Sequence, residues 1–543
     1  MTLLEGRDLS RKGVVVAMAA VVALQLAVCV LFALAKQGMF QDEAFSLVLA
    51  NGSFTGSVPE DGVLYHGGEP WAGWASVGSF LCVDPAQVFQ NQSDDVHPPL
   101  YYLFLNLAYS LFPGSTSLVV GCALNAVFLC GSAPLLYLLG REAGAPRWAS
   151  ALLCLAWAVS AGMANCLLLV RMYALLTAVF LGAALVVARL LSAPRATLSQ
   201  CAALLAVSFL GLFTQYFFAI FAAGLYGAAA VVLLKRRRLR CLAKCAVCAV
   251  AGFALAVAAF PSCIDHVFFG YRGTEALEQA ASNEGFLAAL AQDVRLLDTG
   301  VLGGLLAPLL AAVAALAAVC ALRARKEGVG RGRGSLAGLG AEAVRSEAAP
   351  APSGPRWALM GVLAFSAAFY VLAVARVAPY ASIRYLLAVQ PVLLAAVMLP
   401  LMTLALQALR GRAAVCACAL LAVAVAVTAL GYGYGVKYLD QQNDDVVAAD
   451  RENGAMLVAY QGATLLQALL PDAQASGDSA YFSTLEAFRA FDFSQTPDFS
   501  LYVQPGMDPQ PWLDAASGLP GATVRHVGST IDGYEVYDVH TDA

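Results

Sequence analysis

Two adjacent carboxylates follow the first long apolar stretch of the chain. Asp42 and Glu43 lie in FQDEAFS at residues 40–46, soon after the apolar residues 14–35. Ionisable groups at the edge of an apolar layer cost free energy, so each is a candidate for function. A carboxylate held there can take a proton from a hydroxyl group that acts as a nucleophile. We therefore expect general-base chemistry at this point.

A second polar cluster, SDDVHPPLYY at 93–102, ends the long loop that follows Asp42. Asp95 and His97 stand directly before the pair Pro98-Pro99. Proline has no backbone N–H and restricts the residue before it to an extended conformation. We expect this double proline to hold the acid and the imidazole in a fixed pose over the next apolar piece.

Three further clusters of polar residues interrupt apolar stretches. They are Arg171 and Tyr173 in VRMYALL, Gln215 and Tyr216 in TQYFF, and Arg384 and Tyr385 in RYLL. Arginine binds phosphate through its planar fork and stays charged even when it is partly buried. A carboxylate base and a basic cradle together suit the displacement of a lipid phosphate from a sugar. Hydrolysis of a glycosidic bond needs two facing carboxylates, whereas two adjacent acids point in different directions.

The composition indicates a polytopic membrane protein. Of the 543 residues, 60% are hydrophobic and 13% are charged, whereas a soluble domain has roughly 25% charged residues. The N-terminal apolar stretch exceeds the roughly 7–15 residues of a signal-peptide core, so we expect an uncleaved span. The partners that we expect are a lipid bilayer and lipid-linked substrates, and no nucleic acid.

The apolar stretches predict about eleven membrane spans, since each span needs about 20 apolar residues. The candidates are residues 14–35, 117–139, 148–164, 167–191, 198–214, 216–234, 241–262, 300–322, 357–375, 384–408 and 413–435. Residues 100–112 are too short to span and are expected to be re-entrant or to lean into the bundle.

Basic residues mark the cytoplasmic loops of a membrane protein. Arg7 and Arg11 place the N-terminus in the cytoplasm, and the run KRRRLR at 235–240 fits a cytoplasmic loop. With eleven spans the C-terminus then lies outside. In this topology all five polar clusters lie on the external side, which is the strongest indication of a single site.

We expect four regions. They are a membrane domain at 1–435, within it a first external loop carrying catalytic motifs at 37–99 and a cytoplasmic flexible loop at 323–355, and an external C-terminal α/β domain at 436–543. In the last region, residues 478–483 and 523–539 favour strands, and residues 444–470 favour helices.

The ordered motifs resemble those of a known family. DE after the first span, DVHPPL before the second, VRMYALL, TQYFF and RYLLAVQP at 384–391 resemble the protein O-mannosyltransferase group (family 39) and its broad bacterial relatives. These are membrane glycosyltransferases of the GT-C fold that use polyprenyl-phosphate sugars. The resemblance extends from Asp42 to Pro391. Protein mannosyltransferases continue HPPL with glycine and lysine, whereas Tyr101 and Tyr102 follow here, which places the chain nearer the bacterial group with its varied acceptors.

The resemblance implies a GT-C-like, all-α polytopic bundle and the transfer of a hexose or pentose from a polyprenyl-phosphate donor to an external acceptor in the cell envelope. It implies that Asp42 is the base and Glu43 its support. Around the donor's phosphate and sugar it implies Asp95, His97, Arg171 and Arg384, and we add their neighbours Tyr173, Gln215, Tyr216 and Tyr385. Whether the acceptor is a protein, a lipid or a glycan stays open, as does a divalent cation beside the acids.

Two other functions stay open. A polysaccharide polymerase or ligase with a lipid pyrophosphate donor shares the basic residues but not the DE and HPPL motifs. A transporter of anionic lipids predicts mid-membrane acids and inverted repeats, which the sequence lacks. Single residues also have plainer alternatives, because His97 also fits an ordinary interface histidine and Arg171 a side chain that reaches outward to water.

Overall fold

The computed structural model describes residues 8–52, 58–282, 284–331, 356–409, 412–431 and 435–542. The predicted flexible loop at 323–355 therefore lies outside the described residues from position 332 onward. The chain falls into two compact units. The first contains Met1–Cys29, Val127–Cys166 and Tyr173–Val436, and the second contains Val30–Ala126, Leu167–Met172 and Lys437–Ala543.

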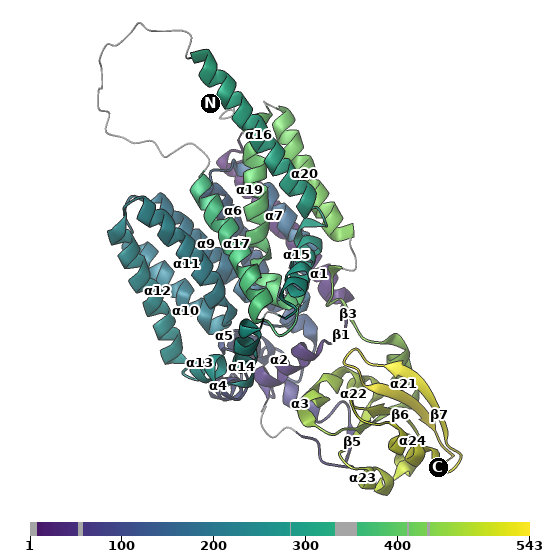
Figure 1. Cartoon of the computed structure of the whole chain (residues 1–543). Helices are drawn as coiled ribbons and strands as arrows, with labels where there is room; N and C mark the ends of the chain where they lie inside the picture. Colours follow the sequence, from purple (N-terminus) through teal and green to yellow (C-terminus); the bar gives the residue numbers. More distant parts are fainter. Residues whose placement is uncertain are drawn as a thin grey trace. The chain divides into compact units, whose positions relative to one another are not determined.

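Long apolar helices make up most of the chain (Figure 1). In the described part, eight helices are long and apolar enough to cross a membrane, and a helix pair bent by 54° makes a ninth. The eight are α1 (Arg11–Ala35), α6 (Leu118–Glu142), α9 (Tyr173–Ser192), α11 (Phe217–Lys235), α12 (Leu239–Ala259), α16 (Leu306–Arg331), α17 (Trp357–Val377) and the run of α18 (Ile383–Leu386), η3 (Leu387–Val389) and α19 (Gln390–Ala408). The bent pair is α7 (Arg147–Ala158) and α8 (Ala161–Leu168).

Two shorter apolar helices complete the set, α10 (Leu198–Thr214) and α20 (Arg412–Gly431). Each of the eleven predicted spans thus corresponds to an apolar helix or helix pair, which confirms a multi-pass, mainly helical membrane protein. Residues 100–112 form only the short helix α5 (Leu100–Ser110).

The helices of the first unit differ in how much surface they leave exposed. Of the apolar window of Ile383–Ala408, 89% is buried, whereas only 17% is buried in α1 and in α12. A helix that is apolar on all sides is stable in a protein core or in a membrane. The run that ends in α19 is therefore central in the bundle, and α1 and α12 turn most of their surface to lipid.

Short helices follow α12 in the first unit. They are α13 (Cys263–Phe268), α14 (Tyr271–Ala281), α15 (Phe286–Leu297) and the π-helix η2 (Asp298–Leu302). Helix α15 packs against α17 and α18.

The second unit is built on a six-stranded sheet of order β2-β5-β4-β6-β8-β7. Its strands are β2 (Leu64–His66), β4 (Ala455–Ala459), β5 (Asp478–Phe482), β6 (Asp498–Val503), β7 (Thr523–Ser529) and β8 (Glu535–His540). The three central strands run parallel and the outer ones antiparallel. Around them lie α21 (Asp444–Asn453), η5 (Ala463–Leu469), α22 (Leu470–Ser476), α23 (Leu485–Ala490), η6 (Phe493–Gln495) and α24 (Gln510–Ser517).

The predicted strands at 478–483 and 523–539 are confirmed, but the helices expected over 444–470 are wrong at residues 455–459. There the sequence AMLVA forms β4, and all five of its residues are buried. A central parallel strand is covered on both faces, so it lacks the polar–apolar alternation that marks other strands.

The long loop after α1 belongs to the same unit as the C-terminal sheet. Its strand β2 pairs with β5, and β1 (Gln37–Gly38) pairs with β3 (Asp440–Gln441). The remaining loop elements are α2 (Gln41–Asn51), α3 (Trp71–Ala75) and α4 (Pro85–Asp94). The predicted domain limits at 435 and 436 stay a prediction.

Candidate functional site

Asp42 and Glu43 occupy the first turn of helix α2, where the N-terminal end of the helix dipole favours negative charge. The helix begins after Phe40, whose backbone N–H donates to Glu43 Oε2 at 2.8 Å. This bond satisfies one of the amide groups that a helix start leaves unpaired. Asp42 and Glu43 have different partners and point in different directions, as their adjacent positions predict.

Glu43 is fully buried, and both of its carboxylate oxygens have partners. Oε2 also accepts from the Lys36 ammonium at 3.0 Å, and Oε1 accepts from the backbone N–H of Val170 at 2.9 Å. Burial raises the pKa of Glu43 above its ordinary value, while Lys36 and the two backbone N–H groups oppose the rise. The carboxylate thus joins the start of helix α2 and the residues just before it to the distant segment that contains Val170.

The segment that carries Arg171 is an irregular stretch between α8 and α9. The Asn125 amide donates to the carbonyl oxygens of Leu167 at 2.9 Å and Leu169 at 3.0 Å, and Asn125 accepts from the Tyr101 hydroxyl at 3.0 Å. Buried carbonyl groups outside a helix need such partners. These bonds fix the stretch that leads into Arg171.

Gly121 also allows the Arg171 segment to lie where it does. A Cβ atom at this position would stand 2.3 Å from Val170 Cγ1. Only glycine permits this approach without a displacement of the Val170 side chain.

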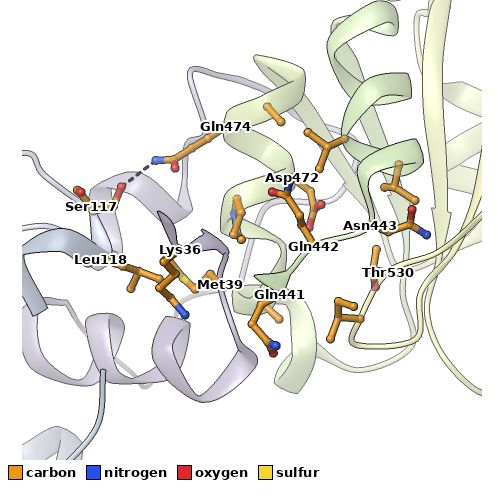
Figure 2. A pocket seen from close by; sticks show the side chains of 18 of the residues that line it. Lys36, Met39, Ser117, Leu118, Gln441, Gln442, Asn443, Asp472, Gln474 and Thr530 are labelled. Atoms are coloured by element: carbon orange, nitrogen blue, oxygen red, sulfur yellow. Dashed lines mark hydrogen bonds between the residues drawn. The ribbon is translucent and has the colours of Figure 1, made fainter. Parts of the chain in front are cut away.

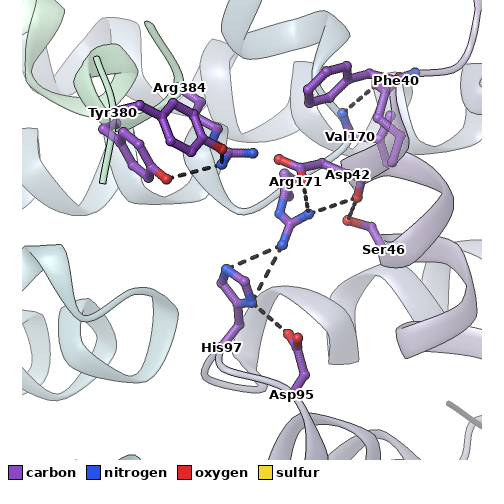
Figure 3. A network of polar contacts seen from close by, with 11 residues as sticks. Phe40, Asp42, Ser46, Asp95, His97, Val170, Arg171, Tyr380 and Arg384 are labelled. Atoms are coloured by element: carbon purple, nitrogen blue, oxygen red, sulfur yellow. Dashed lines mark hydrogen bonds and ion pairs between the residues drawn. The ribbon is translucent and has the colours of Figure 1, made fainter. Parts of the chain in front are cut away.

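Arg171 binds Asp42 directly (Figure 3). Its Nη1 lies 3.0 Å from Asp42 Oδ1 and donates to the Asp42 carbonyl oxygen at 3.0 Å. The side chain of Arg171 is 6% exposed and that of Asp42 is 15% exposed. Asp42 is therefore the acid of the pair that still reaches solvent, while Glu43 is enclosed.

His97 lies on the other side of the same guanidinium group. Arg171 Nη2 is 3.2 Å from His97 Nε2, and His97 Nδ1 is 2.6 Å from Asp95 Oδ2. Because arginine only donates, we assign Nε2 as the acceptor and Nδ1–H as the donor to Asp95, which makes the imidazole neutral. The result is a row of polar contacts from Asp95 through His97 and Arg171 to Asp42.

The pKa shifts of this row agree with a neutral imidazole. Burial and the Arg171 charge lower the pKa of His97, against the opposing effect of Asp95. Burial alone would raise the pKa of Asp95, but His97 and Arg171 bring it below its ordinary value.

Helix α4 sets the position of Asp95 and His97. It ends at Asp94, and α5 begins after Pro99, so the acid and the imidazole occupy the short connection between two helices. The Asn91 amide of α4 donates to the carbonyl oxygens of Leu49 at 3.0 Å and Gly52 at 2.7 Å, which anchors α4 to the end of α2.

The other predicted site residues lie in the first unit. Arg384 Nη2 donates to the Tyr385 hydroxyl at 3.0 Å and also bonds the Tyr380 hydroxyl. The guanidinium lies over both rings, 5.0 Å from the centroid of Tyr385 and 5.3 Å from that of Tyr380. The ring of Phe217 is 5.4 Å from that of Tyr385, so the TQYFF and RYLL motifs are neighbours.

Tyr173, Gln215 and Tyr216 are set within the same unit. Tyr173 and Gln215 are buried. The Tyr216 hydroxyl is 2.8 Å from His266 Nδ1, a buried histidine of α13. His266, Lys36 and Asn125 are not among the site residues predicted from the sequence. Asn125 carried a usable signal, because it is an amide inside the apolar stretch 117–139.

The second unit therefore gathers Asp42, Glu43, Asp95, His97 and Arg171, and the first unit holds Tyr173, Gln215, Tyr216, Arg384 and Tyr385. Within the described ranges, no group of three or more His, Cys, Asp or Glu side chains is arranged to hold a metal ion. In chemical terms, the second unit presents a partly exposed carboxylate fixed by a guanidinium, and the first unit presents a guanidinium between two phenols.

No family model matches this chain, and no curated protein matches it. Among solved structures it is similar to the crystal structure of ArnT from Cupriavidus metallidurans bound to undecaprenyl phosphate. The TM-score is 0.52 at 13% sequence identity, over 97% of this chain and 98% of that chain. The likeness extends over nearly the whole of both chains and shows that this chain has the GT-C fold of membrane glycosyltransferases.

Proposed function

We propose that this protein transfers a sugar from a polyprenyl-phosphate-linked donor to an acceptor on the external face of the cytoplasmic membrane. The observation that carries the proposal is the Asp42 carboxylate, held 3.0 Å from the Arg171 guanidinium and still partly exposed. The shared fold with ArnT, whose crystal structure contains undecaprenyl phosphate, supports a donor of this lipid class.

In the proposed reaction, Asp42 accepts the proton of an acceptor hydroxyl group. The hydroxyl oxygen forms a bond to the anomeric carbon of the sugar, and the bond from that carbon to the phosphate oxygen breaks. Polyprenyl phosphate leaves with the bonding electrons, and the protonated Asp42 then returns its proton to water. The phosphate is a good leaving group, so the reaction needs a base and charge stabilisation more than a general acid.

Arg171 and Glu43 have positioning roles in this proposal. Arg171 contacts both Oδ1 and the carbonyl oxygen of Asp42, so it holds the carboxylate in one orientation. The two carboxylate oxygens of Glu43 accept hydrogen bonds from Lys36, Phe40 and Val170. Glu43 thereby positions the backbone beside Arg171. His97, which bonds to Asp95, contacts the other edge of the Arg171 guanidinium group.

The residues of the first unit are proposed to bind the donor. A guanidinium can bind two phosphate oxygens at once, and the phenols of Tyr380 and Tyr385 hold that of Arg384 in place. Tyr173, Gln215 and Tyr216 are proposed to line the same donor site.

Within the GT-C enzymes, we place the chain with the broad bacterial relatives of the protein O-mannosyltransferases. The motifs DE, DVHPPL and RYLL support this placement, and Tyr101-Tyr102 after HPPL favours an acceptor other than a protein. The sugar is a hexose or a pentose. The basic residues of the predicted cytoplasmic loops support an external site and an external C-terminal domain.

The replacement Asp42→Asn tests the base. It is expected to lower transfer by roughly 100- to 10,000-fold, the usual contribution of a general base, in protein that still folds. The thermal unfolding midpoint is expected to fall, because the nearly buried Arg171 loses its counter-charge. Transfer is measured with purified protein and radiolabelled polyprenyl-phosphate sugars. The matched control is Asp94→Asn, since Asp94 bonds only to Gln90 in the described part of the chain. Full transfer by Asp42→Asn would contradict the proposal.

The same assay separates this function from its alternatives when lipid pyrophosphate sugars are supplied in parallel. Consumption of a lipid monophosphate donor supports the proposal. Consumption of only the pyrophosphate donor would identify a polymerase or ligase instead.

A further inference from the structure

The second unit contains a cavity of about 540 Å³ that the proposed reaction does not yet use (Figure 2). Three parts of the chain line it: the residues between α1 and α2, the start of α6, and the C-terminal elements around β3, α21 and α22 with the turn between β7 and β8. Small-molecule sites have volumes of roughly 300–1,000 Å³. The cavity is therefore large enough for a ligand.

Side-chain amides and hydroxyls dominate the polar lining. The amides are Gln441, Gln442, Asn443 and Gln474, and the hydroxyls are Ser115, Thr116, Ser117 and Thr530. Gln442 and Gln474 each donate once, to Asp444 at 2.7 Å and to Thr116 at 2.9 Å. Among the described residues, no hydrogen bond reaches the side-chain oxygens of these two glutamines.

The hydroxyl groups also keep donors for a ligand. Thr530 Oγ1 accepts from the Tyr534 backbone at 3.1 Å, and Ser117 Oγ accepts from that of Val119 at 3.4 Å. An accepting hydroxyl still has its own proton to donate. Neutral donors and acceptors mixed in this way match the hydroxyl groups of a carbohydrate.

One of the two cations of the lining is already bound within the protein. The Lys36 ammonium is bound by Glu43 at 3.0 Å and by the carbonyl oxygen of Tyr438 at 2.7 Å. The other cation, Arg451, lines the cavity together with two acids, Asp472 and Asp532. Burial, together with neighbouring carboxylates, raises the pKa of Asp472 well above its ordinary value. In its protonated form this acid can donate a hydrogen bond to a neutral ligand.

The cavity also lies beside the proposed base. Lys36, which lines it, forms the ion pair with Glu43, the residue next to Asp42. Met39, another lining residue, lies three positions before Asp42. Burial raises the pKa of Asp532, which also lines the cavity, to about 6, and the charge of Asp42 adds to this rise.

We propose that this cavity binds a neutral glycan through its amides and hydroxyls, and that this glycan is the acceptor of the transfer. Glycan binding, the first half of the proposal, is argued from the cavity alone. The role of this glycan as the acceptor, the second half, rests on the proposed function. A glycan held between Gln442, Thr530 and Lys36 would present a hydroxyl group toward α2, where Asp42 can accept its proton.

Direct binding without donor tests the first half. Full-length protein in detergent micelles is titrated with di- to tetrasaccharides of glucose, mannose, galactose and N-acetylglucosamine, and binding is followed by saturation-transfer NMR. At least one of these is expected to bind. The variants Gln442→Ala and Thr530→Val are each expected to weaken binding by about fivefold, the effect of one lost neutral hydrogen bond.

The matched control is Gln510→Ala, which removes an exposed glutamine of α24 that bonds only locally, to Asp514 and through its backbone to Asp508. Its binding is expected to equal that of the wild type. Absence of binding by every oligosaccharide, or equal binding by the Gln442→Ala and Thr530→Val variants, would overturn the proposal. Stronger binding of inorganic phosphate or of a short peptide in the same cavity would overturn it as well.

Transfer kinetics test the second half. In Gln442→Ala and Thr530→Val, the KM for the bound oligosaccharide is expected to rise about fivefold, whereas in the control Gln510→Ala the KM is expected to equal that of the wild type. Binding that persists without any transfer would refute the proposed function but leave the glycan site standing. Transfer with an unchanged KM would overturn the acceptor role of the cavity.

Discussion

At the scale of single residues, the two adjacent acids Asp42 and Glu43 have different surroundings, and we propose different roles for them. Asp42 stays 15% exposed beside Arg171, whereas the side chain of Glu43 is wholly enclosed. A buried ion pair contributes little net stability, but the removal of one partner leaves the other charge buried and unpaired. The pair of Glu43 and Lys36 is therefore a sensitive point of the second unit.

Glu43→Gln is expected to destabilise the protein by about 3–5 kcal/mol, because the Lys36 ammonium then lacks its counter-charge. Thermal unfolding followed by a fluorescent thiol or tryptophan signal measures the change. The double variant Lys36→Met/Glu43→Gln is expected to regain most of the loss. A double variant as unstable as the single one would show that charge pairing is not the cause.

A second residue-scale prediction concerns pH. Both Asp95 and His97 have folded-state pKa values below their ordinary ones, so the folded state disfavours their protonation. Above a pH of about 6.5 the unfolded histidine is also neutral, and the full stability is present. As the pH falls below about 6.5, the unfolded state gains protons that the folded state does not, and stability is lost.

Unfolding midpoints measured between pH 7.5 and pH 5 check this sign. The wild type is expected to lose stability toward acid, and His97→Gln is expected to show a shallower slope over the same interval. The matched control is His66→Gln, since His66 is an exposed histidine of the same loop. An identical slope in wild type and His97→Gln would contradict the assignment of a neutral imidazole.

At the scale of elements, the loop after α1 supplies an edge strand to a sheet whose other strands come from the end of the chain. Strand β2 pairs with β5, and the Trp71 indole of α3 donates to the Tyr481 hydroxyl of β5 at 2.6 Å, with both side chains fully buried. Because this loop also carries α2 and α4, the sheet supports the elements that hold Asp42 and His97.

Trp71→Ala is expected to destabilise the second unit by about 3–5 kcal/mol, since it removes a large buried ring together with its hydrogen bond to the Tyr481 hydroxyl. Limited proteolysis is expected to cut the loop and the C-terminal residues at the same rate. The control Trp357→Ala changes a half-exposed tryptophan at the start of α17. Faster cleavage of the loop alone would show that it is not part of the same cooperative unit.

At the scale of the whole molecule, eleven apolar helices or helix pairs account for the predicted spans, and the charges between them predict the orientation. None of the 14 cysteines, all of which lie in the described ranges, forms a disulfide bond, and Cys82 and Cys416 are exposed. Thiol labelling therefore suits a test of orientation once these two are replaced by serine.

In that background, Asp508→Cys in the C-terminal part is expected to react with a membrane-impermeant maleimide in intact cells. Arg240→Cys, in the basic run at 235–240, is expected to react only after permeabilisation, because basic loops stay in the cytoplasm. Labelling of Arg240→Cys in intact cells would reverse the predicted orientation.

The sequence by itself determined the membrane class and the places of the spans, because an apolar stretch of about 20 residues reports its own environment without reference to the rest of the chain. It also singled out Asp42, His97 and Arg171, because ionisable residues next to apolar stretches are rare and costly. A related signal, a polar amide inside an apolar stretch, is present at Asn125.

Only the tertiary structure decided what depends on contacts between distant segments. Nothing local to Glu43 shows that its partners are Lys36 and Val170, and nothing local to residues 64–66 shows that they pair with β5. Strand β4 was mistaken for helix because its burial on both faces comes from its sheet neighbours. The contact of Glu43 with Val170 and the pairing of β2 with β5 join distant parts of the chain, and the pattern of each segment alone does not contain its partner.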